Sequence, residues 1–192
     1  MLQNALDFGS HFCNISYMKW IFFSYTLPAK PSKARVYVWR QLKKLGAVNY
    51  QSLWILPSSN YRMSDLKKLM GDIESFKGES LLIDGKTLDK AQEERMNKAF
   101  LNSRNEEYQE LIKKCDDFFK EIQNEIKNKN FIFAEVEENE EEFEKLKLWL
   151  RKIEKRDVLG APLRKTAHDK IKSCERVFED FARRVYEYQK SR

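Results

Sequence analysis

The sequence contains few of the residues that build compact catalytic sites. Its 192 residues include 6 glycines and 2 histidines, and neither G-x-G-x-x-G nor G-x-x-x-x-G-K-[ST] occurs among them. Glycine loops of the dinucleotide-binding and P-loop types are therefore excluded. No nucleophile stands with a base in a catalytic pattern. We expect no catalytic residue, no small-molecule substrate, and a protein that is not an enzyme.

Cysteine is as scarce as histidine. Cys13, Cys115 and Cys174 are odd in number and far apart, which fits a reducing compartment and predicts a cytoplasmic protein. Cys115 and Cys174 fall on apolar helical stripes, so we interpret both as core residues. Neither His11 nor His168 has a second ligand pair at metal-site spacing. We expect neither a metal nor a cofactor.

Long apolar runs are also missing. No segment reaches the ~20 apolar residues of a membrane span. Residues 1–17 lack the basic start and apolar run of a signal peptide. The pattern changes at Met18, where a strand-like segment begins. We expect Met18 to be the natural start and residues 1–17 to be a disordered extension.

The charge is unevenly distributed along the chain. The net charge is +6, and residues 1–88 carry 12 Lys or Arg against 6 Asp or Glu. Residues 89–192 carry 24 of each and are neutral overall. The excess in the first part favours an anionic partner, although proteins without such a partner reach similar charges.

Residues 18–87 alternate between strand and helix patterns. The pattern predicts strands at 20–27 and 80–83, two short strands within 47–57, and helices at 32–46 and about 66–76. This order is β-α-β-β-α-β. We therefore expect an α+β protein whose first domain, residues 18–87, is ferredoxin-like.

Residues 88–192 have helical periodicity and predict a region of about three long helices. The first runs to about Lys129, the second begins near Glu140 and the third near Arg164. Phe131–Val136 alternates, which predicts a short strand or an extended connection. The acidic run Glu135–Glu144 has carboxylates that could bind a divalent ion, but a solvated helix start is the favoured interpretation.

The helix predicted from Ser32 is amphipathic. Ala34, Val38, Trp39, Leu42 and Leu45 share one face, and cations cover the opposite arc. Clustered cations beside an aromatic side chain, here Tyr37, are typical of phosphate-backbone contact and also of a solubilising surface. The candidate nucleic-acid-binding residues are Lys30, Lys33, Arg35, Arg40, Lys43 and Lys44, with Arg62 as a neighbour.

Arg35 is the exception within this set. By the same helical angles it lies at the edge of the apolar side. It either extends past the core to water or a carboxylate, or it has a structural or anion-binding role.

Four motifs stand out along the chain. They are T-L-P-A-K-P-S at 26–32, R-V-Y-V-W-R at 35–40, F-L-N-S-R-N-E-E-Y at 100–108, and R-D with G-A-P within 156–162. Together they resemble the N-terminal module of the ChrB family of chromate resistance proteins, over roughly residues 18–188. The resemblance implies a bacterial regulatory protein of a chromate-resistance operon. Longer members carry a further C-terminal domain, the one more often linked to chromate itself, so the resemblance leaves open whether chromate or another signal is sensed here.

The last two motifs contain four polar residues that we expect to interact with one another. We interpret Arg104, Tyr108, Arg156 and Asp157 as a clasp, either a structural helix–helix contact or an anion site. A third hypothesis, oxyanion or redox chemistry, would need Arg35, Arg104 or Arg156 to converge on a cysteine.

Two functions follow from these patterns. The first is a non-catalytic regulatory module that contacts DNA through the basic helix. The alternative is a protein-interaction or scaffold module whose helical region binds a protein partner or forms a homodimer.

Overall fold

The computed structural model describes residues 18–30 and 32–191, so the extension predicted at residues 1–17 lies outside the described residues. These residues form an α+β structure, with a small antiparallel sheet and five helices. The chain forms two compact units, one ending at Phe100 and the other running from Leu101–Arg192. Helix α3 (Lys90–Asn128) begins in the first unit and continues into the second.

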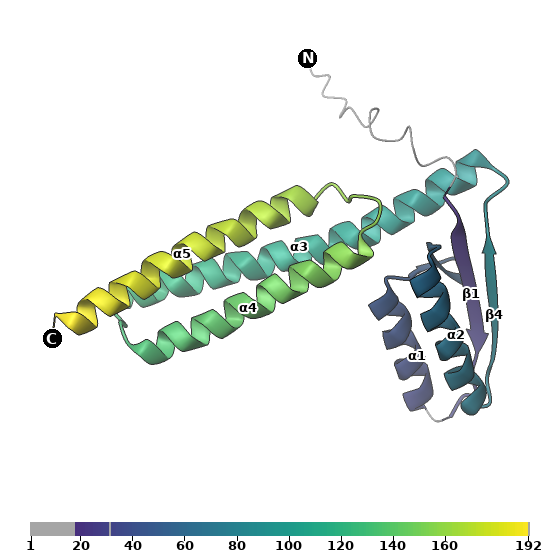
Figure 1. Ribbon diagram of the computed structural model, residues 1–192, viewed down its shortest axis with the longest axis horizontal. Helices are drawn as coiled ribbons and strands as arrows, with labels where there is room; N and C mark the ends of the chain where they lie inside the picture. The colour runs from purple at the N-terminus through teal and green to yellow at the C-terminus, as the bar shows by residue number, and fades with distance from the viewer. Residues whose placement is uncertain (1–17, 31, 192) are drawn as a thin grey trace, which may run out of the picture. The chain divides into compact units, whose positions relative to one another are not determined.

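The first unit contains one four-stranded sheet and two helices. Its strands lie in the order β2-β3-β1-β4, and each neighbouring pair is antiparallel. Helices α1 and α2 both lie on one side of this sheet (Figure 1). In chain order the elements are β1 (Trp20–Thr26), α1 (Ser32–Leu45), β2 (Val48–Tyr50), β3 (Leu53–Pro57), α2 (Asn60–Ser75) and β4 (Glu79–Gly85).

The core of this unit lies between the sheet and the two helices. Alternate residues of a strand point to the same face, so Ile21 and Phe23 of β1 point with Leu56 of β3 towards the helices. Both helices contribute aliphatic side chains to this core. The buried members are Ile21, Phe23, Val38, Leu42, Ala47, Trp54, Leu56, Leu66, Leu69 and Ile73.

The other face of the sheet is covered in part by the start of α3. Trp20 is buried there, and its ring packs edge-on against Phe100 at 6.0 Å between centroids. Met96 is buried as well. The first unit therefore extends past the boundary predicted at residue 87, because the first turns of α3 supply apolar side chains to the sheet.

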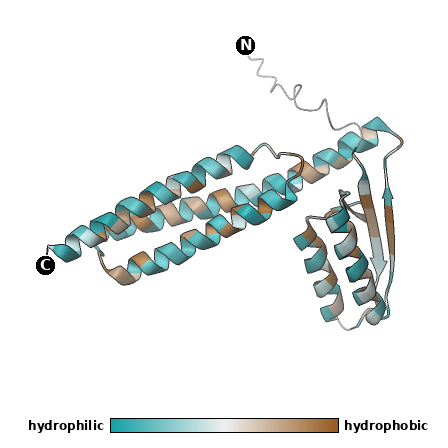
Figure 2. Ribbon diagram, viewed as in Figure 1, coloured by the Kyte–Doolittle hydropathy of each residue, from teal (hydrophilic) through white to brown (hydrophobic). Residues whose placement is uncertain are grey.

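The second unit contains the rest of α3 with α4 (Phe133–Arg156) and α5 (Arg164–Lys190). Figure 2 shows hydrophilic and hydrophobic stretches interspersed along these helices, as expected when each helix buries one stripe. The buried members of the core are Tyr108, Leu111, Cys115, Phe118, Ile122, Phe143, Leu146, Leu150, Ile153, Ala161, Ala167, Ile171, Cys174, Phe181 and Val185. Among the described helices, none is long and apolar enough to cross a membrane.

The strand or extended connection predicted at Phe131–Val136 is wrong, because α4 already begins at Phe133. The Phe131 ring lies 5.5 Å from that of Tyr188 and 6.4 Å from that of Phe181, and Val136 packs on the same core. The alternating apolar residues thus anchor the start of a helix on α5.

Gly78 provides a test of the packing between α2 and β4. A Cβ atom at Gly78 would lie 2.4 Å from the Thr26 carbonyl oxygen, whereas one at Gly71, within α2, would have nothing within 4 Å. Gly78→Ala is expected to lower the free energy of unfolding by about 1 to 3 kcal/mol through overpacking. The control Gly71→Ala is expected to raise it by roughly 0.5 to 1 kcal/mol. Urea denaturation of both variants checks this, and shifts of the same sign would contradict the packing described.

Candidate nucleic-acid interface

Helix α1 is oriented by its three buried residues. Ala34, Val38 and Leu42 recur at intervals of four and are buried against the sheet. At 100° per residue, these positions direct the opposite side of the helix to solvent. The helix contains no acidic residue, and its last turn carries Lys43 and Lys44 next to the partial negative charge of the helix end.

The six predicted cations all lie at the surface of the first unit. Every one of them is exposed, and none forms an ion pair or side-chain hydrogen bond with any residue that the structure describes. The sequence explains this, because no Asp or Glu occurs between Asp7 and Asp65. These residues, here called the α1 cations, are Lys30, Lys33, Arg35, Arg40, Lys43 and Lys44.

Trp39 does not lie in the core as predicted. The Trp39 side chain is 48% exposed, and Val36 is exposed as well. Trp39 is exposed because its position on the helix is rotated about 100° from that of buried Val38. Trp39 stands one turn from both Arg35 and Lys43. An exposed aromatic ring thus lies among the α1 cations, and the helical angle was the signal that would have found it. Arg35 is also exposed rather than placed against the apolar side.

Tyr37, the aromatic residue predicted to accompany the cations, has partners on α2. Its hydroxyl donates to Asp72 Oδ2 at 2.8 Å, and its ring packs edge-on against Phe76 at 5.8 Å. The groove beside it, of about 240 Å³, is lined by Lys44 and Lys68 but also by acidic residues. The uniformly basic surface is therefore the outer side of α1 and not the groove between the helices.

Arg62, expected as a neighbour of the cations, is buried instead. Its Nη1 donates to the Pro57 carbonyl oxygen at 3.0 Å, which joins the start of α2 to the end of β3. Burial lowers the pKa of Arg62. This guanidinium is a structural group and is unavailable to a surface ligand.

The predicted clasp residues lie together in the second unit. The Tyr108 hydroxyl on α3 donates to Asp157 Oδ2 at 3.1 Å, and the same carboxylate accepts from the Ala161 backbone N–H at 3.0 Å. Asp157 is only 3% exposed and ends α4. The Leu163 N–H donates to Asn105 Oδ1 at 3.1 Å. These bonds hold the α4–α5 connection against α3.

Glu107 neutralises the arginines of the clasp. Buried Arg104 lies 2.9 Å from Glu107 Oε1 through its Nη2, and Arg156 forms an ion pair with Glu107 Oε2. Nearby, Glu154 Oε1 accepts from His168 at 2.7 Å and from Arg164 at 3.2 Å. With its cations already paired, this cluster is suited to holding helices together rather than to binding an anion.

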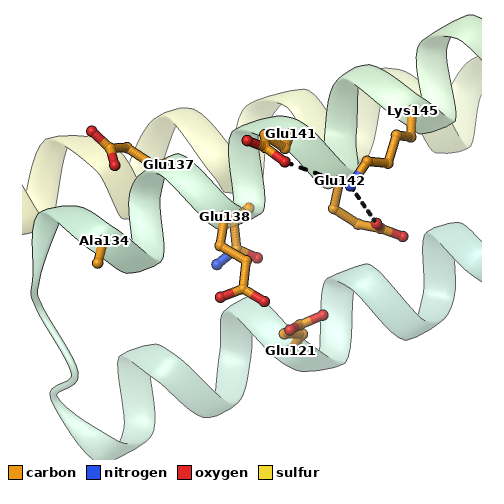
Figure 3. A pocket seen from close by; sticks show the side chains of 8 residues that line it. Glu121, Ala134, Glu137, Glu138, Glu141, Glu142 and Lys145 are labelled. Carbon is orange, nitrogen blue, oxygen red and sulfur yellow. Dashed lines mark ion pairs between the residues drawn. The ribbon is translucent and has the colours of Figure 1, made fainter.

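The acidic run lines a pocket of about 420 Å³ between α3 and α4. Figure 3 shows Glu121 and Glu138 pointing towards one another across it. Lys145 forms ion pairs with Glu141 at 3.7 Å and Glu142 at 4.0 Å (Figure 3). Partial burial, followed by the neighbouring glutamates, raises the pKa of Glu121. Within the described ranges, no three or more His, Cys, Asp or Glu side chains are arranged to hold a metal. Helix α4 begins at Phe133, so Glu135 lies in its first turn and the rest of the acidic run lies further along the helix.

Comparison with known proteins gives one family. The model of the family described as "Protein ChrB, N-terminal" matches residues 35–192. The match begins within α1, at the R-V-Y-V-W-R motif, and includes every clasp residue. No curated protein and no solved structure matches the chain.

Tyr108→Phe tests the clasp. Loss of the buried hydroxyl is expected to lower the free energy of unfolding at pH 7 by about 1 to 2 kcal/mol. Burial and then the Asp157 carboxylate raise the pKa of Tyr108 in the folded protein, so the folded state retains a proton that the unfolded phenol loses near pH 10. The stabilisation is therefore present below about pH 10 and is lost as the pH rises further.

Urea denaturation of Tyr108→Phe and of the unsubstituted protein, at pH 7 and at about pH 10.5, measures the difference between their free energies of unfolding. The control is Tyr186→Phe, because Tyr186 is largely exposed. The described role of the Tyr108 hydroxyl would be contradicted if Tyr108→Phe and the unsubstituted protein were equally stable at pH 7. It would also be contradicted if the difference between their free energies of unfolding increased with pH.

Proposed function

The chain belongs to the family of ChrB N-terminal regions, and we propose that it is a non-catalytic regulatory module that contacts DNA through α1. The observation that carries the proposal is the set of six exposed α1 cations, for which the described residues provide no carboxylate partner. Its role in controlling a bacterial chromate-resistance operon, in the cytoplasm, rests on the family resemblance. The free cysteines Cys115 and Cys174 fit a reducing compartment.

The physical case rests on charge density. Isolated surface cations are common, but an acid-free helix with several cations on its outer side gathers positive charge there, which favours a polyanionic ligand. Phosphate contacts made by such residues release counterions and supply affinity without reading sequence. Trp39 adds an exposed ring beside Arg35 and Lys43, and aromatic side chains among cations are common in nucleic-acid interfaces.

We also infer that the first unit has the ferredoxin-like fold. The βαββαβ element order, the strand order β4-β1-β3-β2 and the placement of both helices on one side support this inference (Figure 1). The inference matters for function because in this arrangement α1 lies on the surface, with its outer side away from the sheet.

A second candidate function is protein binding by the helical unit. One observation favours it: Ile132, Phe133 and Tyr186 are exposed apolar or aromatic side chains, and Gln189 Nε2 donates to the Phe131 carbonyl oxygen at 2.6 Å, which brings the start of α4 near the end of α5. Exposed apolar groups gathered at one end of a bundle are typical of a protein contact.

The DNA proposal predicts a steep salt dependence. If about five α1 cations contact phosphates, the logarithm of the binding constant for a mixed-sequence duplex falls with the logarithm of salt concentration at a slope of about −4 to −5. Arg40→Glu with Lys44→Glu is expected to reduce that slope by about two and affinity at least tenfold. Fluorescence anisotropy between about 50 and 200 mM salt measures both quantities.

The matched control is Lys152→Glu with Lys155→Glu. Both residues are exposed on α4, and their reversal changes the net charge by the same amount. Binding close to that of the unsubstituted protein is expected. A slope near zero, or an equal loss of affinity in the control, would refute contact through α1.

A further inference from the structure

Strand β4 forms an open edge of the sheet. It pairs with β1 along its whole length, from Trp20 opposite Gly85 to Thr26 opposite Glu79, and no strand formed by residues 18–30 or 32–191 lies on its other side. The opposite edge of the sheet is formed by β2, which has three residues, whereas β4 has seven. The longer strand is therefore the better template for another strand.

The outer edge of β4 has few of the features that usually prevent pairing, and its charged residues, Glu79 and Asp84, flank an apolar centre. None of its residues is buried, and the described part of the chain provides no backbone hydrogen bond to β4 other than those of the β1 ladder. Its register with β1 has no bulge, and the strand contains neither lysine nor proline. Natural edge strands are protected by such residues and bulges. Leu81 is 54% and Ile83 is 48% exposed, and the hydrophobic part of β4 is visible in Figure 2.

We propose that β4 pairs antiparallel with β4 of a second copy of this chain, about a two-fold axis at Leu82. In this dimer Leu81 lies opposite Ile83 of the partner, and Ser80 lies opposite Asp84 of the partner. The symmetry produces each of these pairs twice. The four-stranded sheets join into one continuous sheet.

The sequence of β4 selects this register among the symmetric ones. Side chains that lie opposite each other must share a face, so the axis passes through a single residue. An axis at Leu81 would place Glu79 opposite Ile83, and an axis at Ile83 would place Leu82 opposite Asp84. Only the axis at Leu82 matches aliphatic with aliphatic and polar with polar side chains.

The dimer has a consequence that rests on the proposed function. A two-fold axis perpendicular to the sheet keeps α1 and α2 of both copies on the same side. The two sets of α1 cations then face the same direction. Symmetric dimers bind the two half-sites of a DNA duplex in this way.

The test is a charge-swap experiment on the full chain, with the dimer dissociation constant measured by sedimentation equilibrium. Leu81→Lys and Ile83→Glu are each expected to weaken the dimer by about tenfold or more, because the two-fold axis counts each lost cross-strand pair twice. The combined variant is expected to recover most of the affinity, because each introduced ammonium then faces an introduced carboxylate of the partner. Both substitutions occur at half-exposed side chains, and circular dichroism checks that the three variants fold.

Leu53→Lys is the matched control. Leu53 lies on β3 and points to the same open face as Leu81 and Ile83, but not at the β4 edge. Its substitution is expected to leave the dimer unchanged. A monomer at every concentration, a dimer indifferent to Leu81→Lys, or equal sensitivity to Leu53→Lys would each overturn the edge pairing. None of these measurements contains DNA. Failure of the dimer proposal is therefore distinguished from failure of the DNA proposal, which the anisotropy experiment tests.

Discussion

The burial of Ala34, Val38 and Leu42 against the sheet determines which side of α1 faces water. Burying a valine or leucine side chain contributes about 1.5 to 3 kcal/mol. A rotation of the helix about its axis would expose these groups and bring arginines or lysines towards the sheet, where an unpaired charge is far more costly. The basic surface is therefore a fixed consequence of core packing. Its absence of acidic neighbours is a separate property of the sequence.

The clasp and α1 use their arginines in opposite ways. In the helical unit, Arg104 and Arg156 share Glu107, and Asp157 accepts hydrogen bonds from Tyr108 and a backbone N–H. Those charges are neutralised within the fold and stabilise the bundle. On α1 the described residues provide no such partner for Arg35 or Arg40. The presence or absence of a carboxylate partner thus distinguishes arginines that stabilise the structure from those that can contact a ligand. The family motifs include both kinds.

Local patterns predicted the elements of the fold better than the contacts between distant segments. Strand β1 and helices α1, α3 and α5 lie close to their predicted positions, because each has a strong apolar period. Helix α4 begins at Phe133 rather than near Glu140. The first compact unit runs to Phe100 rather than ending near residue 87, because the start of α3 supplies Met96 and Phe100 to its buried residues, and nothing local in the sequence marks that contact. Arg62 was misassigned for the same reason, since its partner is the Pro57 carbonyl oxygen. Trp39 was a different error, because its helical angle already placed it outside the buried stripe.

The central claim is that a polyanion lies along the outer side of α1, and lysine reactivity tests it most directly. The protein would be treated with an amine-modifying reagent, with and without a mixed-sequence DNA duplex, and the modified sites quantified by mass spectrometry. The account predicts that DNA protects Lys30, Lys33, Lys43 and Lys44, while exposed lysines of the helical unit such as Lys120 and Lys152 keep their reactivity. Protection concentrated in the helical unit, or none at any lysine under binding conditions, would contradict it.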